Sequence, residues 1–257
     1  MTASPMLKSP PFDAVGARLG GEVKSVVALS EGERSEMYGL LAGYFANTSR
    51  QQFERDLDEK EWAILLRDAA NRVQGFSTLM RMNLTIGCEP AVVFFSGDTI
   101  IARQYWGETA LPRLWGRHVF SLADRIEDSR VYWFLICSGY KTYRYLPLFF
   151  REFYPSYERA TPAPVKLMLD QLGRLKFGNE YDAARGVIRF HQASPLQSGV
   201  AEITPQRLKD PHVKFFINAN PGHVDGDELA CLAELSRANL TPAGRRMVGE
   251  PESSQQK

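Results

Sequence analysis

The strongest constraint on the fold is a change of hydrophobic period in the first half of the chain. Residues 31–46 repeat apolar side chains every three or four positions, as an amphipathic helix does, and residues 49–59 form a second, more exposed pattern of this kind. Three segments rich in Val, Ile, Thr and aromatic residues then follow, over 62–67, 73–85 and 91–102. Two helices followed by three consecutive strands predict an antiparallel sheet with helices packed against it.

Serine residues mark the expected beginnings of both helices. Ser30 precedes Glu33, and Ser49 precedes Gln52, at the spacing of a capping box, in which side chains bind the free amides of the first turn. The Val-rich segment 22–28 predicts a first strand before these helices. Gly97 interrupts the third strand of the later run, where a glycine often marks a bulge or a close backbone approach.

Beyond residue 102 the pattern alternates between helix and strand. A helix is expected over 112–126, because Pro112 suits a first turn, and a strand over 131–137. A further helix is expected over 142–153, in which Pro147 marks a kink or a later start.

The C-terminal half begins with a proline-rich connector. The pattern then predicts, in order, a helix over 165–175, strands over 187–191 and 213–217, and a last helix over 228–235 capped by Asp225 or Asp227. The two strands are separated by a loop of roughly twenty residues, long enough to suggest a specialised role. The expected organisation is a flexible lead-in over 1–21, a core over 22–155, an extension over 156–240 that completes the sheet and the site, and a flexible tail over 241–257.

Composition excludes several classes of protein. Lys and Arg total 31 against 30 Asp and Glu, and this balance of +1 argues against a general nucleic-acid binder or a polybasic membrane-surface protein. The 3 Cys residues lie far apart, which favours neither a disulfide framework nor a thiolate zinc site, so we expect a reducing, cytoplasmic compartment and no metal. The most apolar long stretch, 131–153, carries Lys141, Arg144 and Arg151, and therefore predicts no membrane span. The N-terminal residues lack the pattern of a secretory signal.

The order of expected elements over about residues 22–155 resembles the GNAT superfamily of N-acyltransferases. The resemblance rests on residues 91–107 (AVVFFSGDTIIARQYWG), the following helix LPRLWGRHVFSLADR, and the segments VYWFLIC and YRYLPLFFREFYP. It implies an α+β fold with a mixed, mostly antiparallel sheet flanked by helices, here with a C-terminal extension of helices and strands. It also implies a fourth strand that bends away from the fifth and opens a V-shaped gap for an acyl-pantetheine arm.

The resemblance also implies where a donor thioester binds. In the family a glycine-rich loop before the next helix presents backbone amides and the positive end of the helix dipole to a pyrophosphate. Here Trp106, Thr109 and Leu111 depart from the glycine-rich pattern in one alignment, while a shifted register matches Gln104 and Gly107 but not Thr109. Arg113 and Arg117, four positions apart on one helix face, are candidates to bind phosphate instead. The candidate cofactor-binding residues are Ile101, Ala102, Arg103, Gln104, Gly107, Thr109, Arg113 and Arg117.

Acyl transfer to an amine needs a base, donors for the developing oxyanion and a proton for the leaving thiolate. The family often places a tyrosine as the acid in the helix after the fifth strand, and Tyr145 is the nearest candidate, with a structural role in the aromatic wall as the alternative. Asp98, beside Gly97, is a candidate base or a turn residue. His223 lies in the polar segment NANPGHVDGDEL and is a third catalytic candidate or part of ordinary turn chemistry. A hydrolase that pairs Cys137 with His223 is a further alternative.

These observations lead to one expected function and one alternative. The expected function is a GNAT-type N-acyltransferase that moves an acyl group from acyl-CoA or an acyl carrier protein to a small-molecule amine. The thioester is a cosubstrate, with no permanently bound cofactor, and a homodimer is a possible assembly. The alternative is a catalytically inactive GNAT-like module that binds a ligand or regulates a partner.

Overall fold

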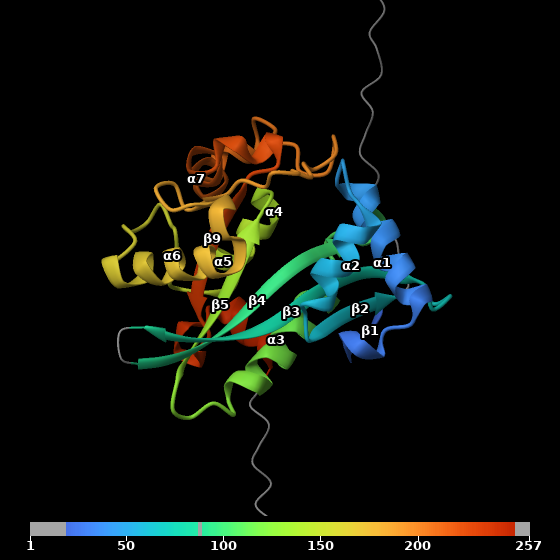
Figure 1. Ribbon diagram of the computed structural model, residues 1–257, viewed down its shortest axis with the longest axis horizontal. Coiled ribbons are helices and arrows are strands. Elements are labelled where there is room, and N and C mark those ends of the chain that lie inside the picture. Colours follow the sequence, from blue (N-terminus) through green and yellow to red (C-terminus); the bar gives the residue numbers. More distant parts are fainter. Residues whose placement is uncertain (1–18, 87–88, 250–257) are drawn as a thin grey trace, which may run out of the picture.

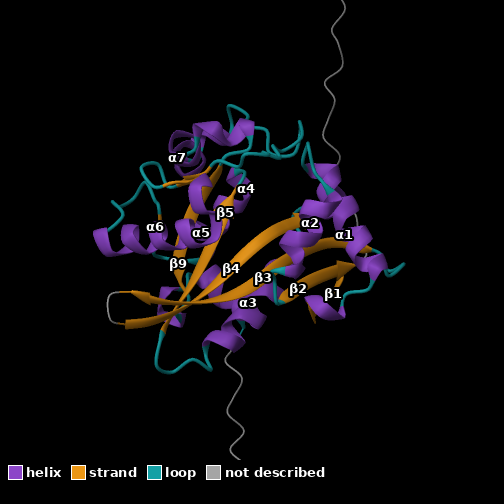
Figure 2. Ribbon diagram, in the orientation of Figure 1, coloured by secondary structure: helices purple, strands orange, loops and turns teal. Residues whose placement is uncertain are grey.

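The computed structural model describes residues 19–86 and 89–249 and forms one sheet with helices packed on both faces (Figures 1 and 2). The strands are β1 (Gly20–Ser25), β2 (Trp62–Arg67), β3 (Val73–Ile86), β4 (Glu89–Ile101), β5 (Arg130–Cys137), β6 (Phe153–Tyr154), β7 (Tyr181–Asp182), β8 (Val187–Ile188) and β9 (Glu228–Glu234). The helices are α1 (Glu31–Tyr44), α2 (Arg50–Asp58), α3 (Ala110–Ala123), α4 (Tyr140–Tyr143), α5 (Tyr145–Phe149), α6 (Ala163–Phe177), α7 (Pro211–Ala219) and α8 (Pro242–Val248).

The sheet is mixed and mostly antiparallel. Its strand order is β1-β2-β3-β4-β5-β9-β8-β7, and β6 also pairs with β9. Among the strand pairs of residues 19–86 and 89–249, only β4–β5 is parallel, because α3 carries the chain back across the sheet between these strands. The expected α+β fold class is therefore confirmed.

The first helix begins as its sequence predicts. The Oγ of Ser30 accepts a hydrogen bond from the amide of Glu33 at 3.3 Å, and the carboxylate of Glu33 accepts one from the amide of Ser30 at 2.7 Å. Lys24 and Arg67 bind the same carboxylate, which joins α1 to β1 and β2. Burial alone would raise the pKa of Glu33, but the hydrogen bonds from Lys24 and Ser30 lower it to about 2.

Alternate residues of the central strands point into different layers. Phe94 and Trp133 pack beneath α3, α5 and α8. Their neighbours Phe95 and Phe134 face the opposite layer, which α6 covers, and Phe76 packs there beneath α1 and α2. This period of two is what the sequence predicts for strands in a layered sheet.

Two C-terminal elements differ from their predicted type. Residues 213–217, expected as a strand, belong to α7, because the side chain of Asp210 caps the helix and Pro211 occupies its first turn. Residues 228–235, expected as a helix, form β9, whose odd-numbered residues enter one core layer and whose even-numbered residues enter the other. A strand buried on both faces is apolar throughout, so its sequence lacks the alternation that identifies a half-exposed strand.

Other boundaries also differ. The expected helix over 142–153 is split into α4 and α5, with Pro147 in the first turn of α5, and its last residues form β6. The first strand covers Gly20–Ser25, so Gly20 and Gly21 belong to the sheet rather than to the expected lead-in, and 26–28 form a short 3-10 turn. Residues 1–18 and 250–257 lie outside the described residues.

The expected flexible tail contains a buried helix. The side chain of Met247 in α8 is 4% exposed, and it packs so closely against α3 that a Cβ added at Gly116 would lie 3.0 Å from its methyl carbon. The C-terminal segment therefore contributes to the core through residue 248. Within residues 19–86 and 89–249, no helix has both the length and the apolar character needed to cross a membrane.

Candidate functional site: a cavity where two parallel strands separate

The parallel strands β4 and β5 separate in the middle of the sheet. Their ladder runs from the pair Ala91 and Arg130 to the pair Ser96 and Leu135. Beyond that point β4 continues to Ile101 paired with β3, while β5 continues to Cys137 paired with β9. The two strands therefore diverge toward the loop after β4 and the beginning of α4, as Figure 1 shows. Their facing edges carry backbone amides and carbonyls that no ladder between them satisfies.

A bulge in β4 begins where this separation begins. Leu79 of β3 lies opposite Ser96, and Ser77 lies opposite Thr99, so Gly97 and Asp98 together face Thr78. A Cβ added at Gly97 would lie 2.6 Å from the Oγ1 of Thr78 and 2.9 Å from the Cε of Lys60. Glycine is needed here for close packing, and the sequence prediction of a bulge at this position is confirmed.

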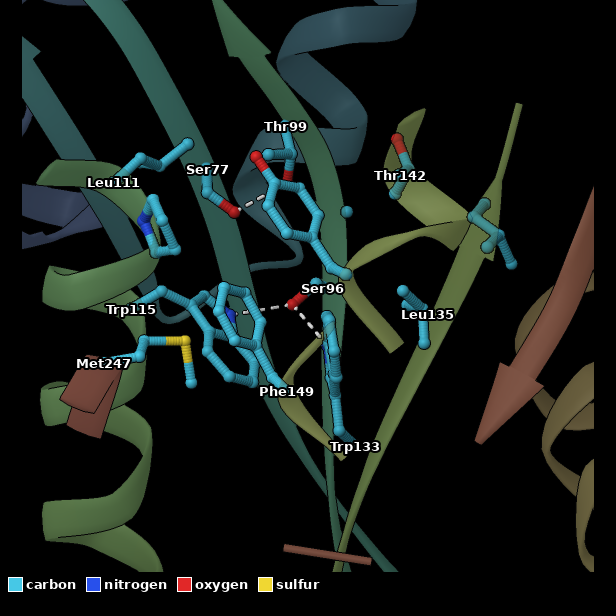
Figure 3. A pocket seen from close by; sticks show the side chains of 14 residues that line it. Ser77, Ser96, Thr99, Leu111, Trp115, Trp133, Leu135, Thr142, Phe149 and Met247 are labelled. Atoms are coloured by element: carbon cyan, nitrogen blue, oxygen red, sulfur yellow. Dashed lines mark hydrogen bonds between the residues drawn. The ribbon is translucent and has the colours of Figure 1, made fainter. Parts of the chain in front are cut away.

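A cavity of about 40 Å³ lies where β4 and β5 part, between these strands, α3 and α5 (Figure 3). Six of its lining residues are half-buried and form what we call the mouth: Gly97, Thr99, Pro112, Ile136, Thr142 and Tyr145. Eight are buried and form the base: Ser77, Ser96, Leu111, Trp115, Trp133, Leu135, Phe149 and Met247. None of the fourteen carries a charge.

Ser96 holds the base of the cavity together. Its Oγ accepts hydrogen bonds from the indole N–H of Trp115 at 3.0 Å and from that of Trp133 at 2.9 Å (Figure 3). The two indole rings lie 4.4 Å apart between centroids. Because a serine hydroxyl has two lone pairs, these two donors use its accepting capacity. The sequence analysis did not select Ser96, whose signal is a hydroxyl directly after the apolar run AVVFF of β4.

Tyr145 lines the mouth of this cavity. Its ring stacks on that of Phe149 one helical turn later, with centroids 5.7 Å apart. Burial raises the pKa of its phenol, so Tyr145 stays protonated at neutral pH. The structure thus brings Tyr145, one of the three predicted catalytic residues, to the cavity where the strands separate.

Asp98 lies in the bulge itself and is joined by an acid that the sequence analysis did not select. Burial raises the pKa of Asp98 to about 6, with the positive charge of Lys60 opposing the shift and Asp56 adding to it. Burial also raises the pKa of Glu228, at the beginning of β9, to about 7, despite a hydrogen bond from Ser138, and the charge of Asp98 raises it further. The sequence analysis assigned Glu228 to a helix, so its place in a strand beside the gap was not foreseen. Two acids titrating near neutral pH suit proton transfer.

His223 lies elsewhere, in the 3-10 turn Pro221–Asp225. Its Nδ1 is 2.9 Å from the backbone carbonyl of Asn220, and its ring packs against Phe216. His223 is not one of the residues that line the cavity. The sulfur of Cys137 contacts that of Cys231 at 3.9 Å, and burial raises the pKa of the Cys137 thiol well above its usual value. A thiol of this kind is not the activated nucleophile that the hydrolase alternative requires.

The loop between β4 and α3 contains most of the candidate cofactor-binding residues. Its backbone is partly used internally, because the amides of Tyr105, Trp106 and Glu108 donate to loop carbonyls. The amide of Ala102 donates to Gln74, and the carbonyl of Ile101 accepts from the indole of Trp106. Several backbone amides that a phosphate-binding loop would present to its ligand are therefore already hydrogen-bonded within the protein.

The remaining candidates line the beginning of α3. Gly107 has a φ of +101°, and the side chain of Thr109 makes no capping hydrogen bond at the helix N-terminus. The side chain of Gln104 binds that of Gln74. Arg113 and Arg117 are exposed on α3, and neither has an ion-pair partner among the described residues. The uncapped end of α3 thus remains open to a negatively charged ligand.

A segment of the long C-terminal loop, residues 195–201, crosses the wide end of the gap, and we call it the strap (Figure 1). At one end the carbonyl of Pro195 accepts from Ala46, and Gln197 binds the carbonyl of Tyr44 at the end of α1. At the other end Arg103 donates to the carbonyl of Gly199, and Lys141 donates to that of Val200. The strap therefore connects α1 to the loop after β4, which contains Arg103, and to α4, which contains Lys141.

Three positively charged side chains, those of Arg103, Lys141 and Arg207, lie close to one another beside the strap. Burial and then the charges of Arg103 and Arg207 lower the pKa of Lys141. The ammonium of Lys141 lies 3.3 Å from the centre of the Trp106 ring, and the guanidinium of Arg103 lies 5.2 Å from it. Within the part of the chain that the structure describes, no three His, Cys, Asp or Glu side chains gather as metal ligands would.

No family model matches the sequence, and no curated protein matches it. Similar solved structures include a probable N-acyltransferase from Enterococcus faecalis V583, with 14% identity and a TM-score of 0.39 over 52% of this chain and 33% of that one. A GNAT-family N-acetyltransferase from Escherichia coli in complex with CoA has 13% identity and a TM-score of 0.38 over 52% of this chain and 71% of that one. An acetyltransferase from Trypanosoma brucei has 18% identity and a TM-score of 0.37 over 56% of this chain and 100% of that one.

The fold class follows from the topology itself. The order of the elements, the mostly antiparallel sheet and the separation of β4 from β5 are the features that the GNAT resemblance implies. The chain therefore has a divergent GNAT fold. The chain spans about a third of the length of the Enterococcus protein.

Proposed function

We propose that this protein is an N-acyltransferase that moves an acyl group from a pantetheine thioester to an amine. The observation that carries the proposal is the gap between β4 and β5, which combines unpaired strand edges, the cavity and the phenol of Tyr145. Pantetheine is an extended chain with two amides, so the free edge of β4 suits it as an extra strand would. The hydroxyls of Thr99, Thr142 and Tyr145 give the mouth a polar lining for the same arm.

The proposed chemistry uses the groups around the bulge. The nitrogen of a neutral amine attacks the carbonyl carbon of the thioester, and the C–S bond breaks as the C–N bond forms. The carboxylate of Asp98, directly or through a water molecule, takes the proton that the amine loses. Tyr145, whose phenol is protonated at neutral pH, gives a proton to the departing thiolate. Unpaired amides of the bulged strand are the donors for the developing oxyanion.

The donor is either acyl-CoA or an acyl carrier protein, and both present a phosphate at the far end of the arm. We propose that Arg103, Lys141 and Arg207 receive that phosphate beside the uncapped end of α3. Arg207→Ala is then expected to raise the KM for an acyl-CoA without changing that for an acyl-pantetheine, which lacks the phosphate. Arg113→Ala tests the alternative phosphate ligand on α3.

The decisive experiment measures thiol release from acetyl-, butyryl- and octanoyl-CoA, and from acyl carrier protein, against a panel of amines. Tyr145→Phe and Asp98→Asn are expected to lower kcat by about 10²–10⁴-fold, the usual contribution of a general acid or base. Tyr143→Phe is the matched control, because Tyr143 is a neighbouring buried tyrosine whose hydroxyl binds the carbonyl of Pro155 and does not line the cavity. If no donor yields product or stabilises the protein against heat, the proposal fails.

The second candidate function is a ligand-binding or regulatory module without catalysis. It is favoured by the loop after β4, in which the amides of Tyr105, Trp106 and Glu108 are occupied by internal hydrogen bonds. Thermal stabilisation by a donor thioester with no turnover against any amine would support this module over the enzyme.

A further inference from the structure

The cavity changes in character from its mouth to its base. The mouth offers three hydroxyls and the open backbone of the bulge, whereas six of the eight base residues are hydrophobic: Leu111, Trp115, Trp133, Leu135, Phe149 and Met247. The two remaining base residues are serines, and both are engaged. Ser77 Oγ lies 2.8 Å from Thr99 Oγ1, and Ser96 accepts from two indoles. A group that fills the base therefore meets an apolar surface with no charge to bind an ammonium or a carboxylate.

The base also lies at the inner end of the gap. Ser96 and Leu135 form the last pair of the β4–β5 ladder and belong to the base. Thr99 and Ile136 of the mouth lie beyond that pair, where the strands have separated. An arm that enters from the wide end of the gap thus brings its terminal group, and not its phosphate, to the base.

We propose that the base of this cavity receives the hydrocarbon end of the donor's acyl group and selects a short chain longer than acetyl. This inference rests on the proposed function, because it takes the thioester arm to lie in the gap. The volume of about 40 Å³ belongs to the mouth and the base together, and a water-sized group occupies roughly 10–15 Å³ of it, so the base holds at most about three methylene or methyl groups. Added to the carbonyl carbon, this gives an acyl group of at most about four carbons.

Met247 sets the depth of the base. Its side chain comes from α8, and it is held against Gly116 of α3 at the closed side of the cavity. Met247→Ala deepens the base. Met247→Val removes less volume and replaces the alanine variant in the test if that variant does not fold. The matched control is Met168→Ala, because Met168 is equally buried, at 5% against 4%, but belongs to α6, in the core layer on the opposite face of the sheet.

The test compares acetyl-, butyryl-, hexanoyl- and octanoyl-pantetheine, whose arm is common to both proposed donors. For the wild type we expect the highest kcat/KM with butyryl and a value about sixteenfold lower with acetyl, at about fourfold for each methylene buried. Met247→Ala is expected to move the maximum to hexanoyl or octanoyl, and Met168→Ala to leave it at butyryl. A maximum at acetyl in the wild type, or an unchanged profile in Met247→Ala, would overturn the inference.

A binding experiment separates this inference from the proposed function. If no thioester is turned over, the proposed enzyme fails, but calorimetry with the unreactive S-alkyl thioethers of pantetheine still measures chain-length selection. An optimum in affinity that moves to longer chains in Met247→Ala then supports the acyl site, and affinity independent of chain length overturns it.

Discussion

Ser96→Ala tests whether one hydroxyl organises the base of the cavity. The substitution removes the acceptor of both indole N–H groups, at 3.0 Å from Trp115 and 2.9 Å from Trp133, and Trp115, Trp133 and Ser96 are all 5–6% exposed. Leaving one buried donor unsatisfied costs about 1–3 kcal/mol, so two such donors lower the free energy of unfolding by about 2–6 kcal/mol. The matched control is Ser77→Ala, which removes a single hydroxyl–hydroxyl contact of a serine that is 2% exposed and is expected to cost about 1 kcal/mol.

Urea unfolding followed by tryptophan fluorescence measures both costs, and two of the 4 tryptophans report directly on the site. In a Trp115→Phe background, the cost of Ser96→Ala is expected to fall by about half, because one of the two donors is gone. If Ser96→Ala costs no more than Ser77→Ala, the indole N–H groups do not depend on this hydroxyl, and the reasoning about the base of the cavity is wrong.

Three further predictions concern the bulge, the two raised acids and the capping box. Gly97→Ala places a methyl group 2.6 Å from Thr78 and is expected to cost about 1–3 kcal/mol in chemical denaturation, whereas Gly39→Ala, in an open part of α1, is expected to stabilise by about 0.5–1 kcal/mol. Folding raises the pKa of Asp98 to about 6 and that of Glu228 to about 7. The folded state therefore binds more protons than the unfolded state between about pH 4 and 7, so the free energy of unfolding falls as pH rises through that range. The change in unfolding free energy caused by Asp98→Asn, and separately by Glu228→Gln, is expected to be more favourable at pH 8 than at pH 4 by about 2–3 kcal/mol. A change that is the same at both pH values would contradict the burial of these acids. Glu33 has the opposite effect, because its lowered pKa contributes stability above about pH 4.5 that is lost as pH falls to about 2. Glu33→Gln is therefore expected to lower the free energy of unfolding by about 3 kcal/mol at pH 7 and by almost nothing at pH 2, measured by thermal or urea unfolding.

The parts of the fold that the sequence predicts are those governed by local chemistry. Ser30 and Glu33 identify the beginning of α1 because a capping box involves only residues of one helical turn. Gly97 identifies the bulge because the close packing of Thr78 and Lys60 there leaves little room for a side chain. The strands near the N-terminus alternate in polarity or carry β-branched residues, and they were predicted within a few residues.

The parts that the sequence does not predict depend on contacts made elsewhere in the chain. Residues 228–234 form a strand because β5 lies beside them and both faces are covered, and neither fact is visible in an apolar run. Glu228 becomes a neighbour of Asp98 only through that strand, so its raised pKa could not be anticipated. Tyr145 was selected by resemblance and does line the cavity, but the role of Ser96 required knowing that two tryptophans from different elements point at it.

The position of β9 has a consequence for how the molecule is made. This strand pairs with β5, yet the neighbouring sulfurs of Cys137 and Cys231 belong to residues 94 positions apart. During synthesis β5 leaves the ribosome long before its partner, with one edge unpaired and apolar on both faces. Nascent chains stalled before residue 228 should therefore recruit chaperones or aggregate, and β5, one wall of the gap, gains its partner on the other edge only when β9 inserts.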